Sequence, residues 1–194
     1  MSDTQKTDLG VMSLTVRDAS LTLASGRLQM ISTSDFVVDR SIASEFLTIK
    51  SGGKLAINED VVLTGAGSNV LVLDYADYSL ANKVGTQGTF ELTGMIDLAS
   101  TATSVSIKGA SYKIIHTADE LAAIRQNSNL NGNYVLGNDL DLTSVANFAP
   151  IGASGAAFTG KFEGLGHTIS NLKVSGAGNV GLFGVLDGSV ISHL

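Results

Sequence analysis

Short runs in which apolar and polar residues alternate, each followed by a cluster of turn-forming residues, restrict this chain to folds built from many short strands. Residues 46–49, 55–57 and 61–63 are such runs, and Ser, Gly, Asn and Asp fill the gaps between them. Alternation with a period of two indicates strands that bury one face, and the clusters predict tight turns. Runs this short favour a coil that bends three times per circuit over a two-sheet sandwich.

The composition supports a glycine-punctuated all-β fold. The 194 residues include 22 glycines, one proline and no cysteine, and 44% of them are hydrophobic. Glycine supplies the backbone conformations that tight turns need, and the apolar fraction is large enough to form a core. Without cysteine the chain has neither a disulfide framework nor a thiolate metal site. We expect one large domain or one stretch of an elongated one.

Charge and hydropathy exclude several partners. Asp and Glu outnumber Lys and Arg by 18 to 12 and the basic residues form no cluster, so nucleic acid is not an expected partner. No apolar stretch approaches the roughly 20 residues of a membrane-spanning helix. Residues 1–6 are polar and lack the pattern of a signal peptide. The sequence therefore predicts either a cytosolic protein or an internal piece of a longer exported chain.

An internal repeat near the end of the sequence predicts a solenoid. Residues 167–172 (His-Thr-Ile-Ser-Asn-Leu) and 189–194 (Ser-Val-Ile-Ser-His-Leu) lie 22 positions apart, and three of their six residues are identical. A spacing of roughly 20–25 residues is the length of one circuit of a parallel β-helix. The repeat aligns His193 with Asn171, which predicts an outward polar position for His193 rather than a catalytic one.

One segment interrupts the β pattern and predicts a short helix of about ten residues within 117–127. Thr117 and Glu120 have the spacing of a capping box, in which each side chain accepts a hydrogen bond from the other residue's backbone N–H. Leu121 and Ile124 fall on one face of such a helix. We expect the helix to cover one side of the core or to mark a junction between two β-helical stretches.

Five motifs between residues 112 and 194 follow one another in an order found in a known family. They are Tyr-Lys-Ile-Ile-His-Thr-Ala-Asp-Glu-Leu at 112–121, Leu-Asn-Gly-Asn-Tyr-Val-Leu-Gly-Asn-Asp-Leu-Asp-Leu at 130–142, Phe-Ala-Pro-Ile-Gly at 148–152, Phe-Thr-Gly-Lys-Phe-Glu-Gly-Leu-Gly-His-Thr-Ile-Ser-Asn-Leu at 158–172 and Gly-Leu-Phe-Gly at 181–184. This region resembles the GLUG-containing repeat region of large bacterial exoproteins of the filamentous-haemagglutinin and high-molecular-weight-adhesin type. Residues 1–111 resemble the low-complexity β-helical body of such proteins only in their general pattern of short strands and turns.

The resemblance implies a right-handed parallel β-helix that is secreted or displayed at the surface of a Gram-negative bacterium and used in adhesion and virulence. Residues 1–111 and the GLUG-type residues 112–194 would then be two stretches of one solenoid. Proteins of this type leave the cell by two-partner secretion, so an outer-membrane transporter and a host-cell surface protein or glycan are the implied partners. We expect a monomer, and we expect the natural protein to continue past Leu194 because an open end would expose strand edges.

Two glycine-rich stretches match nucleotide-binding patterns, but their context predicts turns. Residues 176–181 fit G-x-G-x-x-G, yet no helix is expected after them and no acidic residue follows at the required distance. Residues 155–161 begin like a phosphate loop, yet Phe162 stands where Ser or Thr must hold magnesium. We therefore expect no nucleotide and no other cofactor.

Asp139 and Asp141 form the strongest candidate for a metal site. On a strand, both carboxylates face one side, with Leu140 and Leu142 on the other. Carboxylate oxygens in such a pair can bind calcium. A solvated outer face is the commoner reason for this pattern, so we expect no metal.

The sequence contains no catalytic constellation, so we expect no enzyme activity and no catalytic residue. His116, His167 and His193 are scattered, and no known hydrolase motif surrounds them. A polysaccharide lyase or hydrolase on a β-helix would need carboxylates gathered on one face. The candidate carboxylates are dispersed along the chain, at Asp74, Asp77, Glu91, Asp97, Glu163 and Asp187.

The leading hypothesis is therefore a structural or adhesive module, a rigid rod that spaces or displays a binding site. One alternative is a carbohydrate-active β-helix enzyme, whose acidic side chains would align on successive coils. Another is a secreted protein that captures a host protein or haem in a projecting loop. Such a loop is expected in the longest non-repetitive insertions, residues 74–88 and 143–157. Tyr75 and Tyr78 in the first insertion are expected to pack rather than to anchor a ligand.

Overall fold

The computed structural model describes residues 5–8, 13–16, 19–76, 90–92, 94–152 and 155–194, and all structural statements concern these residues. Strands make up most of the regular structure, alongside one six-residue α-helix and one three-residue 3-10 helix. The chain is therefore all-β, as the short alternating runs predict.

In the first part of the chain, up to residue 107, the regular elements of the described residues are all strands. They are β1 Gln5–Asp8, β2 Ser13–Val16, β3 Ala19–Ala24, β4 Arg27–Ser32, β5 Phe36–Val38, β6 Ile42–Ser44, β7 Phe46–Ser51, β8 Leu55–Ile57, β9 Val61–Leu63, β10 Leu71–Tyr75, β11 Phe90–Leu92, β12 Ile96–Leu98 and β13 Ser104–Ile107. The second part, residues 110–194, contains β14 Ala110–Ile115, α1 Ala118–Ala123, the 3-10 helix Asn127–Asn129, β15 Asn133–Leu136, β16 Leu140–Asp141, β17 Lys161–Glu163, β18 Ile169–Ser170 and β19 Val190–Ser192.

Three consecutive groups of three strands, here called layers, pair with one another in the first part. The layers are β4–β6, β7–β9 and β10–β12, and each strand pairs in parallel with its counterpart in the next layer. The first step between layers leads from Phe36 to its partner Leu55. Leu55 pairs in turn with Phe90 of the third layer. This second step is longer because a long segment of the chain precedes β11.

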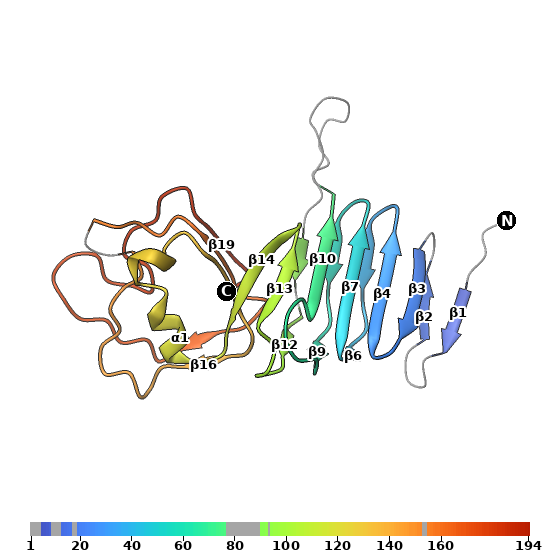
Figure 1. Ribbon diagram of the computed structural model, residues 1–194, viewed down its shortest axis with the longest axis horizontal. Coiled ribbons are helices and arrows are strands. Elements are labelled where there is room, and N and C mark those ends of the chain that lie inside the picture. Colours follow the sequence, from blue (N-terminus) through green and yellow to red (C-terminus); the bar gives the residue numbers. More distant parts are fainter. Residues whose placement is uncertain (1–4, 9–12, 17–18, 77–89, 93, 153–154) are drawn as a thin grey trace, which may run out of the picture.

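A nine-stranded sheet connects the two parts, in the order β19-β17-β15-β14-β13-β10-β7-β4-β3 (Figure 1). Most neighbours are parallel, but β3–β4 and β13–β14 are antiparallel hairpins. Ser25-Gly26 and Lys108-Gly109 form their two-residue turns, and all four residues have positive φ, as such hairpins require. The alternation within residues 21–30 thus reflects a hairpin rather than successive bends of a coil.

Alternate side chains of the layers fill a first hydrophobic core. In β9, Val61 and Leu63 are buried while Val62 is 41% exposed, which is the pattern expected of a strand with one face in the core. The same alternation occurs in β5, β7 and β10. The buried residues of this first core run from Leu28 to Tyr112 and Ile114, with Val135 and Leu165 added from the second part.

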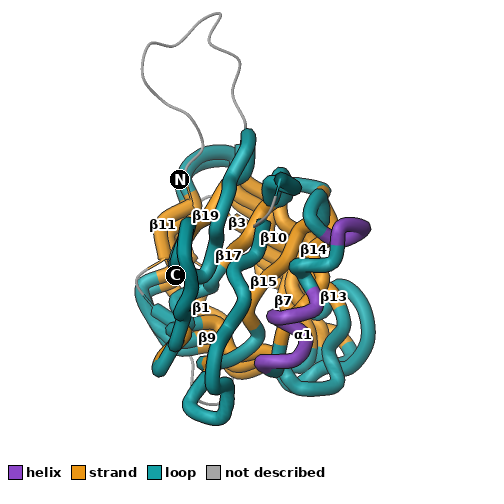
Figure 2. Tube along the Cα trace, turned by 90° about the vertical axis from the view of Figure 1, so that its left-hand side faces the viewer, coloured by secondary structure: helices purple, strands orange, loops and turns teal. Residues whose placement is uncertain are grey.

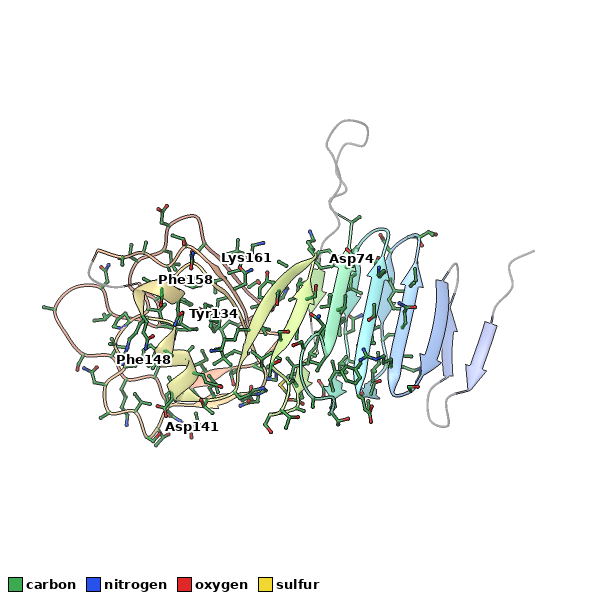
Figure 3. The ribbon with its side chains drawn as sticks, in the orientation of Figure 1. Asp74, Tyr134, Asp141, Phe148, Phe158 and Lys161 are labelled. Atoms are coloured by element: carbon green, nitrogen blue, oxygen red, sulfur yellow. The ribbon has the colours of Figure 1, made fainter. Side chains whose placement is uncertain are left out.

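A second hydrophobic core lies on the opposite face of the sheet, beyond β14. In β15, Val135 belongs to the first core, whereas Tyr134 and Leu136 on either side of it belong to the second. The sheet is therefore buried on both faces here. Figure 3 shows Tyr134, Phe148 and Phe158 within the loops of the second part. Phe158 and Phe162 are fully buried in this second core.

The helix begins where the sequence predicts and ends earlier. Thr117 caps α1, its hydroxyl accepts from the Glu120 N–H at 3.2 Å, and the capping box is confirmed. Leu121 and Ile124 are buried in the second core. The α-helix spans six residues rather than the expected ten, because the N–H groups of Ile124, Arg125 and Gln126 bond to carbonyls three residues back instead of four. Asn129 Nδ2 also donates to the carbonyl of Ala123 at 2.9 Å.

The repeat does not mark one circuit, which corrects the interpretation of residues 167–172 and 189–194. Ile169 pairs with Leu140 in the β16–β18 sheet, whereas Ile191 pairs with Phe162 in the nine-stranded sheet. The two segments share a local shape instead, since Asn171 and His193 both adopt positive φ. The true step in this region is longer than the repeat and leads from Lys161 to Val190.

Glycines in the second part allow backbones to approach closely. A Cβ on Gly160 would collide with the carbonyl of Gly132, and one on Gly164 would collide with the carbonyl of His193. Gly166 has a φ of +85°, a backbone conformation that glycine adopts readily in a turn. At Gly160 and Gly164 the lack of a side chain lets neighbouring segments of the second part touch.

Candidate functional site

An open polar groove of about 470 Å³ lies between the start of α1 and the segment that contains β16. The residues that line it are His116, Thr117, Ala118, Asp119, Asn138, Asp139, Leu140, Asp141, Ser144 and Val145. Figure 2, which views the molecule from the end that carries α1, shows the helix at the surface. Ser144 and Val145 come from the 143–157 insertion, one of the two places where a ligand site is expected.

The helix side of the groove is fixed by backbone hydrogen bonds to one carboxylate. Glu120 Oε2 accepts from the backbone N–H groups of His116 at 2.7 Å and Thr117 at 3.1 Å. The His116 ring joins this side to the other, because its Nδ1 lies 3.0 Å from Asn138 Oδ1. The amide of Asn138 donates in turn to the carbonyl of Asp139 at 2.6 Å, so Oδ1 faces the ring.

Asp139 and Asp141 lie on the exposed side of the segment and Leu140 and Leu142 are buried, which confirms the predicted facing. Asp139 Oδ1 accepts from the backbone N–H of Thr168 at 2.8 Å. This hydrogen bond is the largest cause that lowers the pKa of Asp139, and the nearby His167 lowers it further. Asp139 is therefore ionised at neutral pH.

The carboxylate of Asp141 links its own turn to Asn171, which follows β18. Its Oδ1 accepts from the Thr143 hydroxyl at 2.6 Å, from the Thr143 N–H at 2.9 Å and from Asn171 Nδ2 at 2.8 Å. The hydroxyl hydrogen bond is the largest cause of the lowered pKa of Asp141, and the Asn171 amide is the second. The predicted solvated face is thus exposed, but each carboxylate also links neighbouring segments.

The groove can accept hydrogen bonds and favours cationic or hydroxyl-bearing ligands, since its ionisable lining consists of three aspartates and one histidine. In the described part of the chain, no group of three or more His, Cys, Asp or Glu side chains is placed to hold a metal ion. Calcium binding by Asp139 and Asp141 therefore gains no support from the arrangement.

A second polar cluster surrounds Glu163, which the sequence marked only as one of several scattered carboxylates. Glu163 is 6% exposed, and it accepts from the Ser192 hydroxyl at 2.6 Å and the Leu165 N–H at 2.9 Å, while His193 Nδ1 lies 2.9 Å away. Burial raises the pKa of Tyr112, and Glu163 raises it further. Because Ser192 donates to Glu163 rather than to His193, the histidine does not activate the hydroxyl.

The other candidate carboxylates that the structure describes lie on separate elements. Asp74 is exposed on the first part and lies far from Asp141 (Figure 3), Asp97 is half-buried in β12 and Asp187 is exposed near the last strand. Asp77 and the side chain of Glu91 lie outside the described residues. So do Tyr78 and most of the 74–88 insertion.

Both glycine-rich stretches lead into strands. β19 follows residues 176–181, and β17 begins at Lys161, so neither stretch precedes the helix that a nucleotide site needs. Tyr75 packs against the first core, and the Lys108 ammonium lies 4.3 Å from the centre of its ring. The expectation that Tyr75 packs is confirmed.

A comparison with known proteins finds similarity to part of one very long chain. The alignment with Halomucin of Haloquadratum walsbyi runs over 122 residues at 34% identity. It covers 56% of this chain and 1% of Halomucin. No family model matches the chain, so membership of the GLUG group stays a prediction. No solved structure matches either. In the described residues, no helix is long and apolar enough to cross a membrane.

Proposed function

We propose that the chain is a stretch of right-handed parallel β-helix that serves as a structural and adhesive module of a surface or secreted protein. The observation that carries the proposal is the pairing of each strand in one layer with its counterpart in the next, in three sheets at once. A stack of this kind is stable only when each layer lies against its neighbours, and such stacks form stiff rods. Stiffness suits a module that spaces or displays a binding site.

The end of the second part that contains β19 presents a surface suited to further strands. Five apolar side chains near β19 are at least 36% exposed: Val180, Val185, Leu186, Val190 and Leu194. β19 also lies at the end of the nine-stranded sheet, so one of its edges has no partner among the described strands. An apolar, unpaired strand edge is unusual at a free surface. This arrangement, and the small share of Halomucin that the chain matches, support a place within a longer rod.

The similarity to Halomucin also supports a surface location, since Halomucin is a large surface protein. It comes from an archaeon rather than a Gram-negative bacterium. Export by two-partner secretion through an outer-membrane transporter therefore rests on the GLUG resemblance alone. We propose that the partner is a host-cell protein or glycan, and that residues 1–111 and 112–194 are two stretches of one solenoid.

Adhesion can be tested with the whole chain immobilised on beads. We expect the beads to retain cells or members of a glycan array, and we expect Asp119→Asn to weaken retention if the groove is the site. Asp74→Asn, an exposed carboxylate on the first part, is the matched control. Retention no better than that of uncoated beads, on a broad panel of cells and glycans, would reject the adhesive role and leave only the structural role.

A carbohydrate-active enzyme is the second candidate, because the groove gathers Asp119, Asp139 and Asp141 on one surface. Against it, Asp139 and Asp141 each accept from a backbone N–H and are ionised, so neither resembles a general acid with a raised pKa. Release of reducing ends or unsaturated sugars from a polysaccharide panel would favour the enzyme. Loss of that activity in Asp119→Asn would locate it in the groove.

A further inference from the structure

His167 lies where the second part meets the last layer of the first. Its side chain is fully buried, and its Nε2 is 2.8 Å from the backbone carbonyl oxygen of Ile96 on β12. A carbonyl oxygen can only accept a hydrogen bond, so Nε2 must carry a hydrogen. Two backbone hydrogen bonds cross the same junction, from the Ile96 N–H to Leu165 at 3.1 Å and from the Leu98 N–H to Gly137 at 2.9 Å.

The other ring nitrogen of His167 faces a carboxylate. Nδ1 lies 3.4 Å from Asp139 Oδ1, is buried, and forms no hydrogen bond within the usual geometric limits. An ionised carboxylate accepts hydrogen bonds and donates none. On a neutral ring that is protonated at Nε2, the lone pair of Nδ1 would point at a negative charge and a buried polar atom would have no partner, which folded proteins rarely tolerate.

We propose that His167 is a buried imidazolium, and that its second proton binds Asp139 and so holds the ring where Nε2 donates to Ile96 on β12. The protonated ring donates from Nε2 to Ile96 and points its Nδ1–H at Asp139. Charge-assisted contacts of this kind are the stronger class of hydrogen bond. A modest shift of the ring shortens the 3.4 Å contact to hydrogen-bond length.

The charged groups on the elements around the ring leave Asp139 as the partner. Asp97 follows Ile96 on β12 and is half-buried, and in the described structure it forms no hydrogen bond or ion pair with the ring. Glu163 on β17 is already bound by Ser192 and His193. The ion pair with Asp139 at 3.4 Å is therefore the contact that responds to the charge of His167 in the described structure.

His116 offers an internal comparison because it bridges the same two parts without a carboxylate. Its Nδ1 lies 3.0 Å from Asn138 Oδ1 and its Nε2 lies 3.4 Å from the carbonyl oxygen of Ala102. This ring is half-buried, so water can serve whichever nitrogen loses its proton. The loss of a proton should therefore disturb the junction much less at His116 than at His167.

The proton on His167 makes the junction sensitive to pH. An unfolded chain releases a histidine proton near pH 6.5, at roughly the value of a model peptide. The charge-assisted contact with Asp139 exists only while the ring carries its second proton, so its contribution to the junction is present at acidic pH and is lost as the pH rises and the ring becomes neutral. The junction then loosens in mildly alkaline solution, while the first two layers, β4–β6 and β7–β9, which form no described hydrogen bond with His167, stay intact.

Nitrogen-15 NMR of the histidine rings in the full chain tests this directly. We expect both nitrogens of His167 to be protonated at pH 6, and protection of the Ile96 and Leu98 amides, corrected for intrinsic exchange, to fall as the ring titrates. In Asp139→Asn, which retains an oxygen for the Thr168 N–H, the proton affinity of His167 should fall at least about tenfold. In Asp141→Asn, an equally exposed carboxylate that contacts no histidine, it should not change.

A neutral His167 ring at pH 5 in the folded chain would overturn the proposal. An identical titration of His167 in wild type and Asp139→Asn would overturn it as well. Because His193 also lies against a carboxylate, that of Glu163, the amide readout is repeated in His193→Gln, where the pH response at Ile96 and Leu98 should persist. If Asp139→Asn fails to fold, the ring titration of the wild-type chain still decides.

Discussion

The two parts of the molecule build the same kind of parallel contact in different ways. In the first part a short step separates the first two layers, from Phe36 to Leu55, and strands of three to six residues carry most of the contact. In the second part the step is longer, from Asn133 to Lys161 and on to Val190, and the strands after β14 shrink to between two and four residues. Isolated bridges such as Ile151 to Phe183 replace ladders there.

Polar side chains take over the role of the missing ladders in the second part. Asp139 binds Thr168, Asn147 Oδ1 accepts from the Ser175 N–H at 2.8 Å, and Glu163 binds Ser192, each across one such long step. These contacts each depend on one side chain, whereas a backbone ladder tolerates many substitutions. The comparison therefore predicts that the second part is more sensitive to mutation, and that it can open while the first part stays folded.

The largest effect is expected from the second core. Phe158→Ala removes a fully buried ring whose centre lies 5.3 Å from the ring centre of Phe183 and 6.3 Å from that of Tyr134. The change should destabilise the second part by about 3–5 kcal/mol. Hydrogen exchange should then quicken in β15–β19 while β4, β7 and β10 stay protected. The matched change in the first core is Leu47→Ala. Equal loss of protection in both parts of Phe158→Ala would show that the two cores unfold as one unit.

A smaller loss is expected where backbones touch. Gly160→Ala places a Cβ against the carbonyl of Gly132 and should cost about 1–3 kcal/mol, measured by urea unfolding. Gly109→Ala is the control, because it has positive φ but no atom within 4 Å of the added Cβ, and should cost about 1 kcal/mol through backbone strain alone. A Gly160→Ala protein as stable as wild type would mean that the backbone segments of Gly160 and Gly132 lie further apart.

Loss of the helix cap should have a smaller effect still. Thr117→Ala removes the hydroxyl that accepts from Glu120 and should destabilise the second part by about 1 kcal/mol. Thr117→Ser keeps the hydroxyl and should remain close to wild type. Thermal unfolding of the two variants side by side decides, and a Thr117→Ser protein as unstable as Thr117→Ala would assign the effect to the lost methyl group instead.

The smallest effect is expected on folding stability at acidic pH. The pKa values of Asp139 and Asp141 are lowered in the folded state, so their contributions are present above the unfolded value of about 3.9 and are lost as the pH falls through the folded values. Stability should decline more gently between about pH 5 and pH 2 in Asp141→Asn than in wild type. Urea midpoints at several pH values measure this, and parallel curves would contradict it.

The sequence predicts the elements that repeat locally and misses those that depend on distant neighbours. Alternation identifies β7, β8 and β9, and the Thr117–Glu120 spacing identifies α1, because both signals come from residues close together in the chain. The repeat at 167–172 and 189–194 misleads because it reflects a shared turn at Asn171 and His193, not a pairing.

The candidate site follows the same division. The exposed side of Asp139 and Asp141 can be predicted from period two, and Ser144 lies in an insertion that length alone singles out. The pairing of His167 with Ile96 cannot be predicted, since 71 residues separate them and no local pattern links them. The same is true of the burial of Glu163, because its hydrogen-bond partners Ser192 and His193 are also distant in the sequence.

The most direct test of the layered arrangement uses engineered disulfides, which the cysteine-free sequence makes simple to interpret. Lys161→Cys with Val190→Cys joins residues paired in parallel across one step of the second part. Ser170→Cys with Ser192→Cys joins residues that are equivalent in the sequence repeat but placed in different sheets. We predict that the first pair oxidises rapidly within one molecule, by mass spectrometry of the monomer, and that the second does not. Rapid oxidation of the second pair and none of the first would contradict the account.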